Sequence, residues 1–193
     1  IMTPEVLYSF GRVSDPQVSP DNSKILYGVT YVSIDQNKTN RELFVMNIDG
    51  SGKTQITNTS YSENNAIWVK NGSKIAFLSS ESGSAQIWEM NPDGTARVQI
   101  SDIEGGINGF SYSPDESKVL FFKNVKYGKR TSDLYADLPK ASGRVVDDLM
   151  YKHWDHWVEE IPHPFVADLN GEKLSNIIDI LSNEPYESPM PVS

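Results

Sequence analysis

A strand–turn–strand unit occurs three times in this chain, and this repetition restricts the possible folds more than any other feature. The clearest copy spans residues 112–122, where Tyr-Ser-Pro-Asp-Glu-Ser-Lys precedes the apolar run Val-Leu-Phe-Phe. Earlier copies span residues 18–27 and, with a different turn, 68–77. In each copy Pro, Asp, Asn, Ser or Gly favours a chain reversal, and an apolar strand begins after the lysine. The chain is therefore expected to be a repeat protein.

The spacing of the copies indicates the size of the repeated unit. Lys24, Lys74 and Lys118 follow the three turns at intervals of 50 and 44 residues, and the turn glycines Gly50 and Gly94 are also 44 residues apart. A four-stranded propeller blade needs roughly 40 to 45 residues. Asp-Gly between apolar runs also predicts a hairpin between the last two strands of a unit. We therefore predict an all-β fold, a partial β-propeller of about three WD40-like four-stranded blades in an open ring.

The repeat also divides the chain into segments. The lead-in contains apolar residues compatible with either an edge strand or a short helix, and the last segment looks like a link toward a further unit. The predicted segments are a lead-in at 1–13, blades at 14–58, 59–104 and 105–181, and the link at 182–193.

The third unit contains an insertion. Lys118 and the turn glycine Gly171 are 53 positions apart in the sequence, whereas Lys74 and Gly94 are 20 positions apart. About 33 residues, at about 126–161, are therefore inserted between the second and third strands of this blade. In an antiparallel blade this connection lies on the face opposite the short turns, so we expect binding groups on that face. Within the insertion, residues 132–138 predict a short helix ended by Pro139.

Composition excludes several functions. The chain has 17 basic and 26 acidic residues and a formal charge of −9, which argues against nucleic acid as a partner, because that role needs a basic face. It contains no cysteine, so disulfides, thiolate zinc sites and cysteine nucleophiles are excluded. No apolar run approaches the ~20 residues that cross a bilayer, so no membrane span is expected. With 38% hydrophobic residues, the 193-residue chain can still form a packed core.

The repeats and several local motifs resemble a known family. Ser-Pro-Asp units that end in Asp-Gly or Asn-Gly hairpins resemble the propellers of TolB-like proteins and of the prolyl oligopeptidase family of serine peptidases. Residues 2–5 and 12–21 look like the start of the acylaminoacyl-peptidase and dipeptidyl-peptidase 5 branch, and three later segments are also similar to that branch. These segments span residues 149–157, 163–168 and 185–190.

The resemblance implies a longer parent protein. In this family a propeller of about seven or eight blades covers an α/β-hydrolase domain that carries Ser, Asp and His. This chain would be its first three blades. It has no Gly-x-Ser-x-Gly motif, and the nearest segment, residues 109–113, lacks the last glycine. We therefore expect no catalytic residues, no cofactor and no hydrolytic activity in this segment itself.

Two adjacent carboxylates are candidate substrate ligands. Related dipeptidyl peptidases use acidic residues of a propeller insertion to hold the protonated N-terminus of the substrate, and Glu159 and Glu160 resemble such a pair. Charge-assisted hydrogen bonds to an ammonium group are about twice as strong as neutral ones. The alternative is a solvated acidic loop without a ligand.

For the aromatic and ionisable residues near this pair, a role in binding also has to be weighed against a purely structural role. Trp154 and Trp157 either line a pocket for an apolar substrate side chain or, as we favour, attach the insertion to the blade. Asp155 is expected to fix the loop through a hydrogen bond. His153 and His156, with His163, suggest zinc, but His-x-x-His without a third ligand does not make a metal site, and none is predicted.

The resulting functional prediction is the N-terminal propeller segment of a periplasmic or secreted serine exopeptidase, whose signal peptide is absent from this chain. Its partners would be short peptides, the missing blades and the hydrolase domain. The main alternative is a non-enzymatic TolB-like propeller for protein–protein interaction, and a sugar-binding propeller is a third possibility. Three blades do not close a ring, so we also expect self-association through open blade edges.

Overall fold

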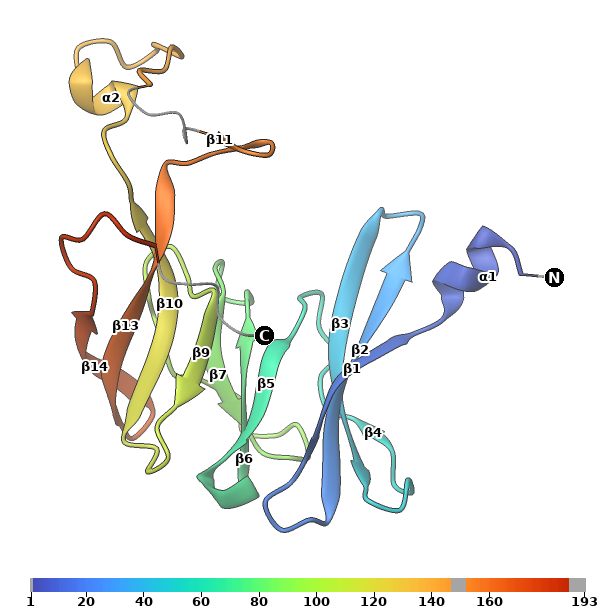
Figure 1. The fold of residues 1–193 in the computed structure, drawn as a ribbon. Coiled ribbons are helices and arrows are strands. Elements are labelled where there is room, and N and C mark those ends of the chain that lie inside the picture. Colours follow the sequence, from blue (N-terminus) through green and yellow to red (C-terminus); the bar gives the residue numbers. More distant parts are fainter. Residues whose placement is uncertain (1, 147–151, 188–193) are drawn as a thin grey trace.

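The computed structural model describes residues 2–146 and 152–187, and its main feature is three four-stranded antiparallel sheets side by side (Figure 1). The order in each sheet follows the chain, so each sheet is a simple meander. Together with the family described below, this arrangement confirms the prediction of an all-β, open propeller fold.

The strands have the following bounds. The first sheet contains β1 (Arg12–Val18), β2 (Lys24–Ser33), β3 (Lys38–Asn47) and β4 (Thr54–Gln55). The second contains β5 (Asn64–Val69), β6 (Lys74–Ser79), β7 (Gln86–Met90) and β8 (Val98–Gln99). The third contains β9 (Gly109–Tyr112), β10 (Lys118–Lys126), β13 (Glu160–Asn170) and β14 (Lys173–Asp179). A separate hairpin pairs β11 (Lys152–His153) with β12 (His156–Trp157).

The repeated turns are held by aspartate side chains. Asp115 accepts hydrogen bonds from the Ser113 and Ser117 hydroxyls at 2.6 and 2.8 Å, and Asp21 does the same with Ser19 and Ser23. These hydroxyl donors favour the ionised form and lower the pKa of both aspartates to about 2. The second unit lacks this aspartate, and a 3-10 turn, η1 (Lys70–Gly72), replaces the motif.

Apolar side chains pack between neighbouring sheets. Leu26, Leu43 and Val45 of the first sheet contact Ile75, Phe77 and Met90 of the second in one buried cluster. A second cluster joins the second and third sheets and includes Leu78, Ile87, Val119 and Phe121. The core is therefore divided into layers between blades, as expected when each repeat buries its face against the next.

A buried polar contact also joins the second and third sheets. Glu89 of β7 is buried, and its carboxylate accepts from Lys70 Nζ at 2.5 Å and from the Tyr112 hydroxyl at 3.0 Å. The Lys70 backbone N–H donates to both Glu116 carboxylate oxygens. Lys70 belongs to η1 of the second unit and Tyr112 to β9 of the third sheet, so the contact fixes how the two sheets meet.

The lead-in is a helix, which resolves the alternative that the sequence left open. Helix α1 (Pro4–Ser9) begins with the Thr3 hydroxyl accepting from the Val6 N–H at 3.3 Å. The helix predicted at residues 132–138 is shorter than expected and begins one residue earlier, as α2 (Thr131–Leu134). Tyr135 already leaves the helical region, so this helix ends well before Pro139.

Candidate functional site on the insertion of the third sheet

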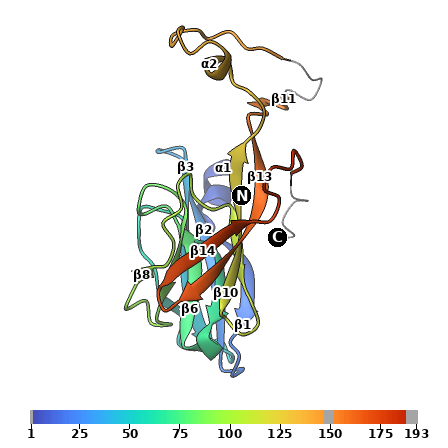
Figure 2. The same ribbon diagram turned by 90° about the vertical axis from the view of Figure 1, so that its left-hand side faces the viewer.

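The connections between the second and third strands of each sheet lie on one face, opposite the short turns (Figure 1). In the first two sheets they span residues 34–37 and 80–85, whereas in the third they span residues 127–159. We call residues 127–159 the insertion. Its described residues, 127–146 and 152–159, stand above the sheets (Figure 2). Its size and position agree with the expectation of one elaborated face.

The base of the insertion is a continuation of the sheet. β10 and β13 pair without interruption up to Lys126 and Glu160, and the Tyr127 N–H donates to the Glu159 carbonyl at 2.8 Å. Glu159 and Glu160 are therefore held where the insertion returns to the sheet.

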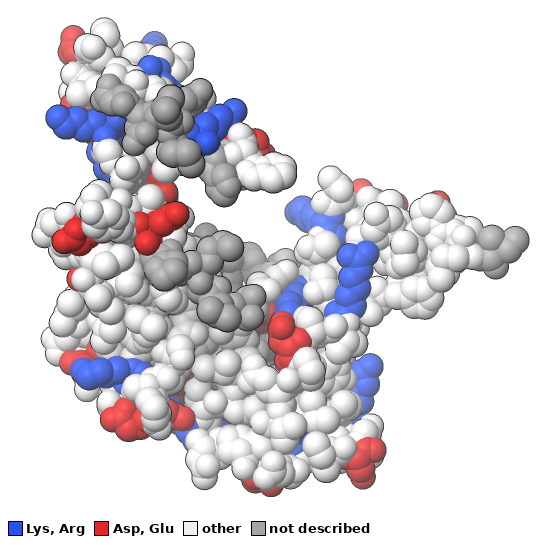
Figure 3. Space-filling model, in the orientation of Figure 1, with Lys and Arg blue, Asp and Glu red and all other residues white. Residues whose placement is uncertain are grey.

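Both glutamates have arginine partners. Arg130 Nη2 lies 2.9 Å from Glu160 Oε1, and Arg130 Nε lies 3.6 Å from Glu159 Oε2. Arg144 forms a second ion pair with Glu159. All of these side chains are between one third and one half exposed, so each contact is screened by water. Lys and Arg side chains are visible over the described part of the insertion in Figure 3. The pair predicted from the sequence is thus an ordered cluster of carboxylates and guanidinium groups.

The two tryptophans differ in environment. Trp157 is partly exposed, and its ring lies 4.3 Å from Arg144 Cζ and 5.4 Å from Lys152 Nζ. Trp154, at the tip of the β11–β12 hairpin, is 90% exposed. Trp157 is therefore partly packed against side chains of the insertion. The prediction that Trp154 attaches the insertion to the blade is wrong.

The backbone at the tip is unusual. Trp154 has a φ of 55°, and it is the first of the two residues that join β11 to β12. Glycine is usual at this position because a side chain is strained there. Asp155, the second loop residue, is exposed. An exposed, bulky side chain at a strained position is a sign of function rather than of packing.

Of the three histidines, the structure describes the side chain of His163 alone. No group of three or more His, Cys, Asp or Glu side chains in the described part of the chain has a geometry that suits a metal ion. The side chains of His153 and His156 lie outside the described part. His163 is buried in β13 and its Nδ1 lies 3.0 Å from Asp179 Oδ2.

Sequence reasoning missed two kinds of residue. Arg130 and Arg144 hold the glutamates from distant positions in the insertion, and no motif or spacing links them to residues 159–160. The sequence indicated His163 as a possible metal ligand and as part of the family-like segment 163–168, and no pattern links it to Asp179. A signal for His163 did exist, since it occupies the same strand position as the buried Glu42 and Gln86.

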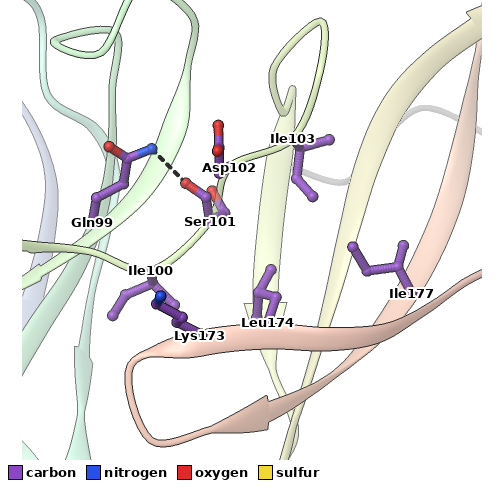
Figure 4. Close-up of a pocket in the computed structure, with 8 residues that line it drawn as sticks. All are labelled: Gln99, Ile100, Ser101, Asp102, Ile103, Lys173, Leu174 and Ile177. Atoms are coloured by element: carbon purple, nitrogen blue, oxygen red, sulfur yellow. Dashed lines mark hydrogen bonds between the residues drawn. The ribbon is translucent and has the colours of Figure 1, made fainter.

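A cavity also lies away from the insertion, between the outer strands of the second and third sheets. It has a volume of about 370 Å³ and lies between β8 with the loop after it and β14 (Figure 4). Its lining residues are Gln99, Ile100, Ser101, Asp102, Ile103, Lys173, Leu174 and Ile177. The Leu174 N–H donates to the Ile100 carbonyl at 3.4 Å beside it, so the cavity is a gap between packed blades.

Among the described residues, no helix is long and apolar enough to cross a bilayer.

Comparison with known proteins agrees with this fold. Residues 4–146 match the family described as TolB beta propeller domain. The chain is 54% identical over 189 residues to dipeptidyl-peptidase 5 of Porphyromonas gingivalis and 39% identical over 190 residues to dipeptidyl-peptidase 5 of Porphyromonas endodontalis. Each match covers 98% of this chain and 28% of the relative, so the chain spans less than a third of the length of these curated relatives.

Solved structures show the same fold at low identity. An acylaminoacyl peptidase in complex with Z-Gly-Gly-Phe-chloromethyl ketone matches 90% of this chain and 26% of its own, with a TM-score of 0.67 and 17% identity. A putative TolB from Agrobacterium tumefaciens matches 84% of this chain and 46% of its own, with a TM-score of 0.53 and 22% identity. The predicted resemblance to the dipeptidyl-peptidase 5 and acylaminoacyl-peptidase branch is confirmed.

Proposed function

We propose that this chain, which belongs to the TolB beta propeller domain family, is the propeller segment of a serine exopeptidase. In this role it recognises the free N-terminus of short peptides. The identity of 54% to a dipeptidyl-peptidase 5, over nearly the whole chain, is the observation that carries this proposal. The chain covers 28% of that relative, which leaves room in a parent protein for further blades and a hydrolase domain.

In this proposal the insertion contributes the amine-binding groups. Arg130 contacts both glutamates and so holds the two carboxylates side by side. A carboxylate accepts several hydrogen bonds, and an ammonium group donates three, so an ammonium group bound between Glu159 and Glu160 adds contacts to those of Arg130 and Arg144. The propeller then has two roles: it restricts access to short peptides, and it anchors their amine.

The hairpin next to this cluster supplies an apolar surface. Trp154 projects from the tip and is available to an apolar side chain of the same peptide, while Trp157 lies under Arg144 at the base. Aromatic side chains contribute large apolar contact area at low cost in conformational entropy. Asp155 helps to hold the loop that presents Trp154.

A titration tests the amine-binding role. Calorimetry on the full-length product of the gene that contains this chain compares a dipeptide with a free amine, which a dipeptidyl peptidase does not cleave, and its N-acetylated form. We expect the free amine to bind at least tenfold more tightly, because charged groups contribute roughly 1.5–3 kcal/mol per hydrogen bond. Glu159→Gln and Glu160→Gln should remove this difference, and Asp137→Asn, an exposed carboxylate elsewhere in the insertion, should not. Equal affinity for both peptides would contradict the role.

The exposure of Trp154 also supports a second candidate, a non-enzymatic propeller that binds a protein partner. The two functions differ in the gene. An exopeptidase requires a Gly-x-Ser-x-Gly segment and a hydrolase domain in the same open reading frame, and a binding propeller does not. Sequencing the complete gene therefore separates them.

A further inference from the structure

A buried polar residue occurs at the same position of the third strand in all three sheets. Met46, Met90 and Ala167 pair with the first apolar residues of the preceding strands, Ile25, Ile75 and Val119. Four residues before each of them lie Glu42, Gln86 and His163, all buried. A polar side chain at a core position in every repeat needs a partner in every repeat.

In the first two sheets the partner is the hydroxyl of a residue that lies two positions after the end of the fourth strand. The Leu43 N–H donates to Thr57 Oγ1 at 2.8 Å, and this hydroxyl donates to Glu42 at 2.6 Å. The second sheet repeats the pattern, with the Ile87 N–H donating to Ser101 Oγ at 2.8 Å and this hydroxyl donating to Gln86 at 2.7 Å. Glu42 also accepts a hydrogen bond from the backbone N–H of Thr59, and Gln86 accepts one from the backbone N–H of Ile103. We call this arrangement the outer-strand clamp.

In the third sheet the groups exchange roles. Pro164 stands where Leu43 and Ile87 stand, and proline has no N–H to donate, so the hydroxyl is not needed. Asp179 pairs with Phe165 as Gln55 pairs with Phe44 and Gln99 with Trp88, so it lies two residues before the position of the two hydroxyls. Its carboxylate accepts the Leu181 N–H at 2.9 Å. His163 Nδ1 lies 3.0 and 3.2 Å from the two oxygens of Asp179. Because a carboxylate only accepts, Nδ1 carries the proton. The carboxylate has moved from the third strand to the fourth, and the third strand now donates.

The contact between His163 and Asp179 lies near the base of the insertion. His163 is three residues from Glu160 in β13, the strand that continues into the insertion (Figure 1). β14 is an edge strand whose pairing with β13 is irregular between Val166 and Asp168, so the ladder alone holds it weakly. Lys123 of β10 is the cross-strand neighbour of His163.

We propose that His163 and Asp179 form a positioning pair that fixes the direction in which Glu159 and Glu160 leave the sheet. The pair attaches β13 to β14 three residues from Glu160, and it acts on the glutamates through the backbone of β13. The purpose of this positioning rests on the proposed function, but the pair itself does not.

Amide hydrogen exchange on the 193-residue chain tests the pair. His163→Ala should increase exchange of the Leu181, Glu160 and Ile161 amides by at least tenfold, because the contact that closes this end of the sheet is lost. His163→Gln places the second sheet's residue there, keeps a donor toward Asp179, and should restore most of the protection. Gln86→Ala, the matched change in the second sheet, should increase exchange at Ile103 and leave Glu160 and Ile161 protected. Unchanged exchange in His163→Ala, or an equal increase at Glu160 and Ile161 in Gln86→Ala, would overturn the proposal.

The position of the imidazole proton gives a second readout that does not depend on variants. Nitrogen-15 NMR of the imidazole should show His163 protonated at Nδ1, and a ring protonated at Nε2 alone would contradict the pair. A failure of the amine-binding proposal can be told apart from a failure of the His163–Asp179 pair. If the glutamates do not bind the amine, the unmodified protein binds free and acetylated peptides equally, while the exchange and NMR results stay as expected.

Discussion

Tyr112 is the residue whose ionisation is most strongly coupled to the contact between the second and third sheets. Burial, followed by the nearby Glu89 carboxylate, raises the pKa of its hydroxyl above the ordinary value of 10.0. The neutral hydroxyl donates to Glu89, so ionisation would place two negative groups together in a buried site.

This coupling predicts a loss of stability at alkaline pH. Because the pKa is raised in the folded state, the stabilisation is fully present below pH 10.0 and decreases as the pH rises above it, where only the unfolded tyrosine ionises. Tyr112→Phe should cost about 1 kcal/mol at pH 8 and remove up to about 1.4 kcal/mol per pH unit from the alkaline slope. Urea denaturation at pH 8 and pH 11 measures both quantities. An unchanged slope in Tyr112→Phe would show that the hydroxyl is not buried against Glu89.

A second prediction concerns the aspartates of the repeated turns. Ser113 and Ser117 lower the pKa of Asp115 to about 2, so the turn keeps its stabilisation above the ordinary value of 3.8 and loses it as the pH falls toward 2. Ser113→Ala should raise this pKa toward 3.8, as NMR titration of the carboxyl group would record. The equivalent change Ser19→Ala should affect Asp21 in the same direction. A pKa of Asp115 near 3.8 in the unmodified chain would contradict the turn geometry.

Individual residues were predictable from the sequence where a local rule applies. The turn aspartates belong to a short motif that can be recognised without a structure. Glu159 and Glu160 were selected by the resemblance to the peptidase family, and their role stays a prediction. Arg130 and Arg144 meet the glutamates only because the insertion folds back on itself, and no local rule describes that path. The packing of Trp154 was predicted wrongly, because tryptophan is usually buried and the hairpin tip is an exception.

At the scale of elements, equivalent turns of different sheets provide matched experiments. Gly50 and Gly94 end the same hairpin in the first and second sheets, and both have a φ of 84°. A Cβ at Gly50 would meet no atom within 4 Å, whereas a Cβ at Gly94 would collide with the backbone carbonyl oxygen of Ile56 in the first sheet. The second hairpin is therefore packed against its neighbour and the first is not.

The two glycine substitutions should therefore differ. Gly50→Ala should cost about 1 kcal/mol, the strain of an alanine at positive φ. Gly94→Ala should cost at least about 2 kcal/mol more, because backbone atoms of two sheets must also separate. Thermal and urea denaturation of both variants measures the difference. Equal losses would mean that the first two sheets do not approach each other as described.

The elements were predictable where hydrophobic periodicity and turn chemistry agreed. The strands that follow Lys24, Lys74 and Lys118 begin at those lysines, as expected. The outer strands β4 and β8 are only two residues long, and the helix in the insertion ends early. These ends depend on contacts between sheets and within the insertion, which the local sequence does not specify.

At the scale of the whole molecule, the outer face of the third sheet is apolar. The strand register places Leu120 beside Val166 and Val166 beside Ile178, and Ile178 and Ile180 are 62% and 54% exposed. β14 is also an edge strand of its sheet. Exposed apolar faces and free strand edges both favour association.

The isolated 193-residue chain should therefore self-associate at high concentration. Light scattering should give a mass above the 21.6 kDa of one chain, and Ile178→Lys with Ile180→Lys should lower it. Ile48→Lys, at an exposed position in a turn of the first sheet, is the control and should not. A monomer at all concentrations would contradict this prediction.

The most direct test of the whole account is the analysis of products released by the full-length protein that contains this chain. Mass spectrometry of a hexapeptide digest should show dipeptides released in sequence from the free N-terminus, and no release from the N-acetylated peptide. Glu159→Gln with Glu160→Gln should remove this preference while the sheets remain folded. Absence of peptidase activity, or faster cleavage of the acetylated peptide, would contradict the assignment of this propeller to amine recognition.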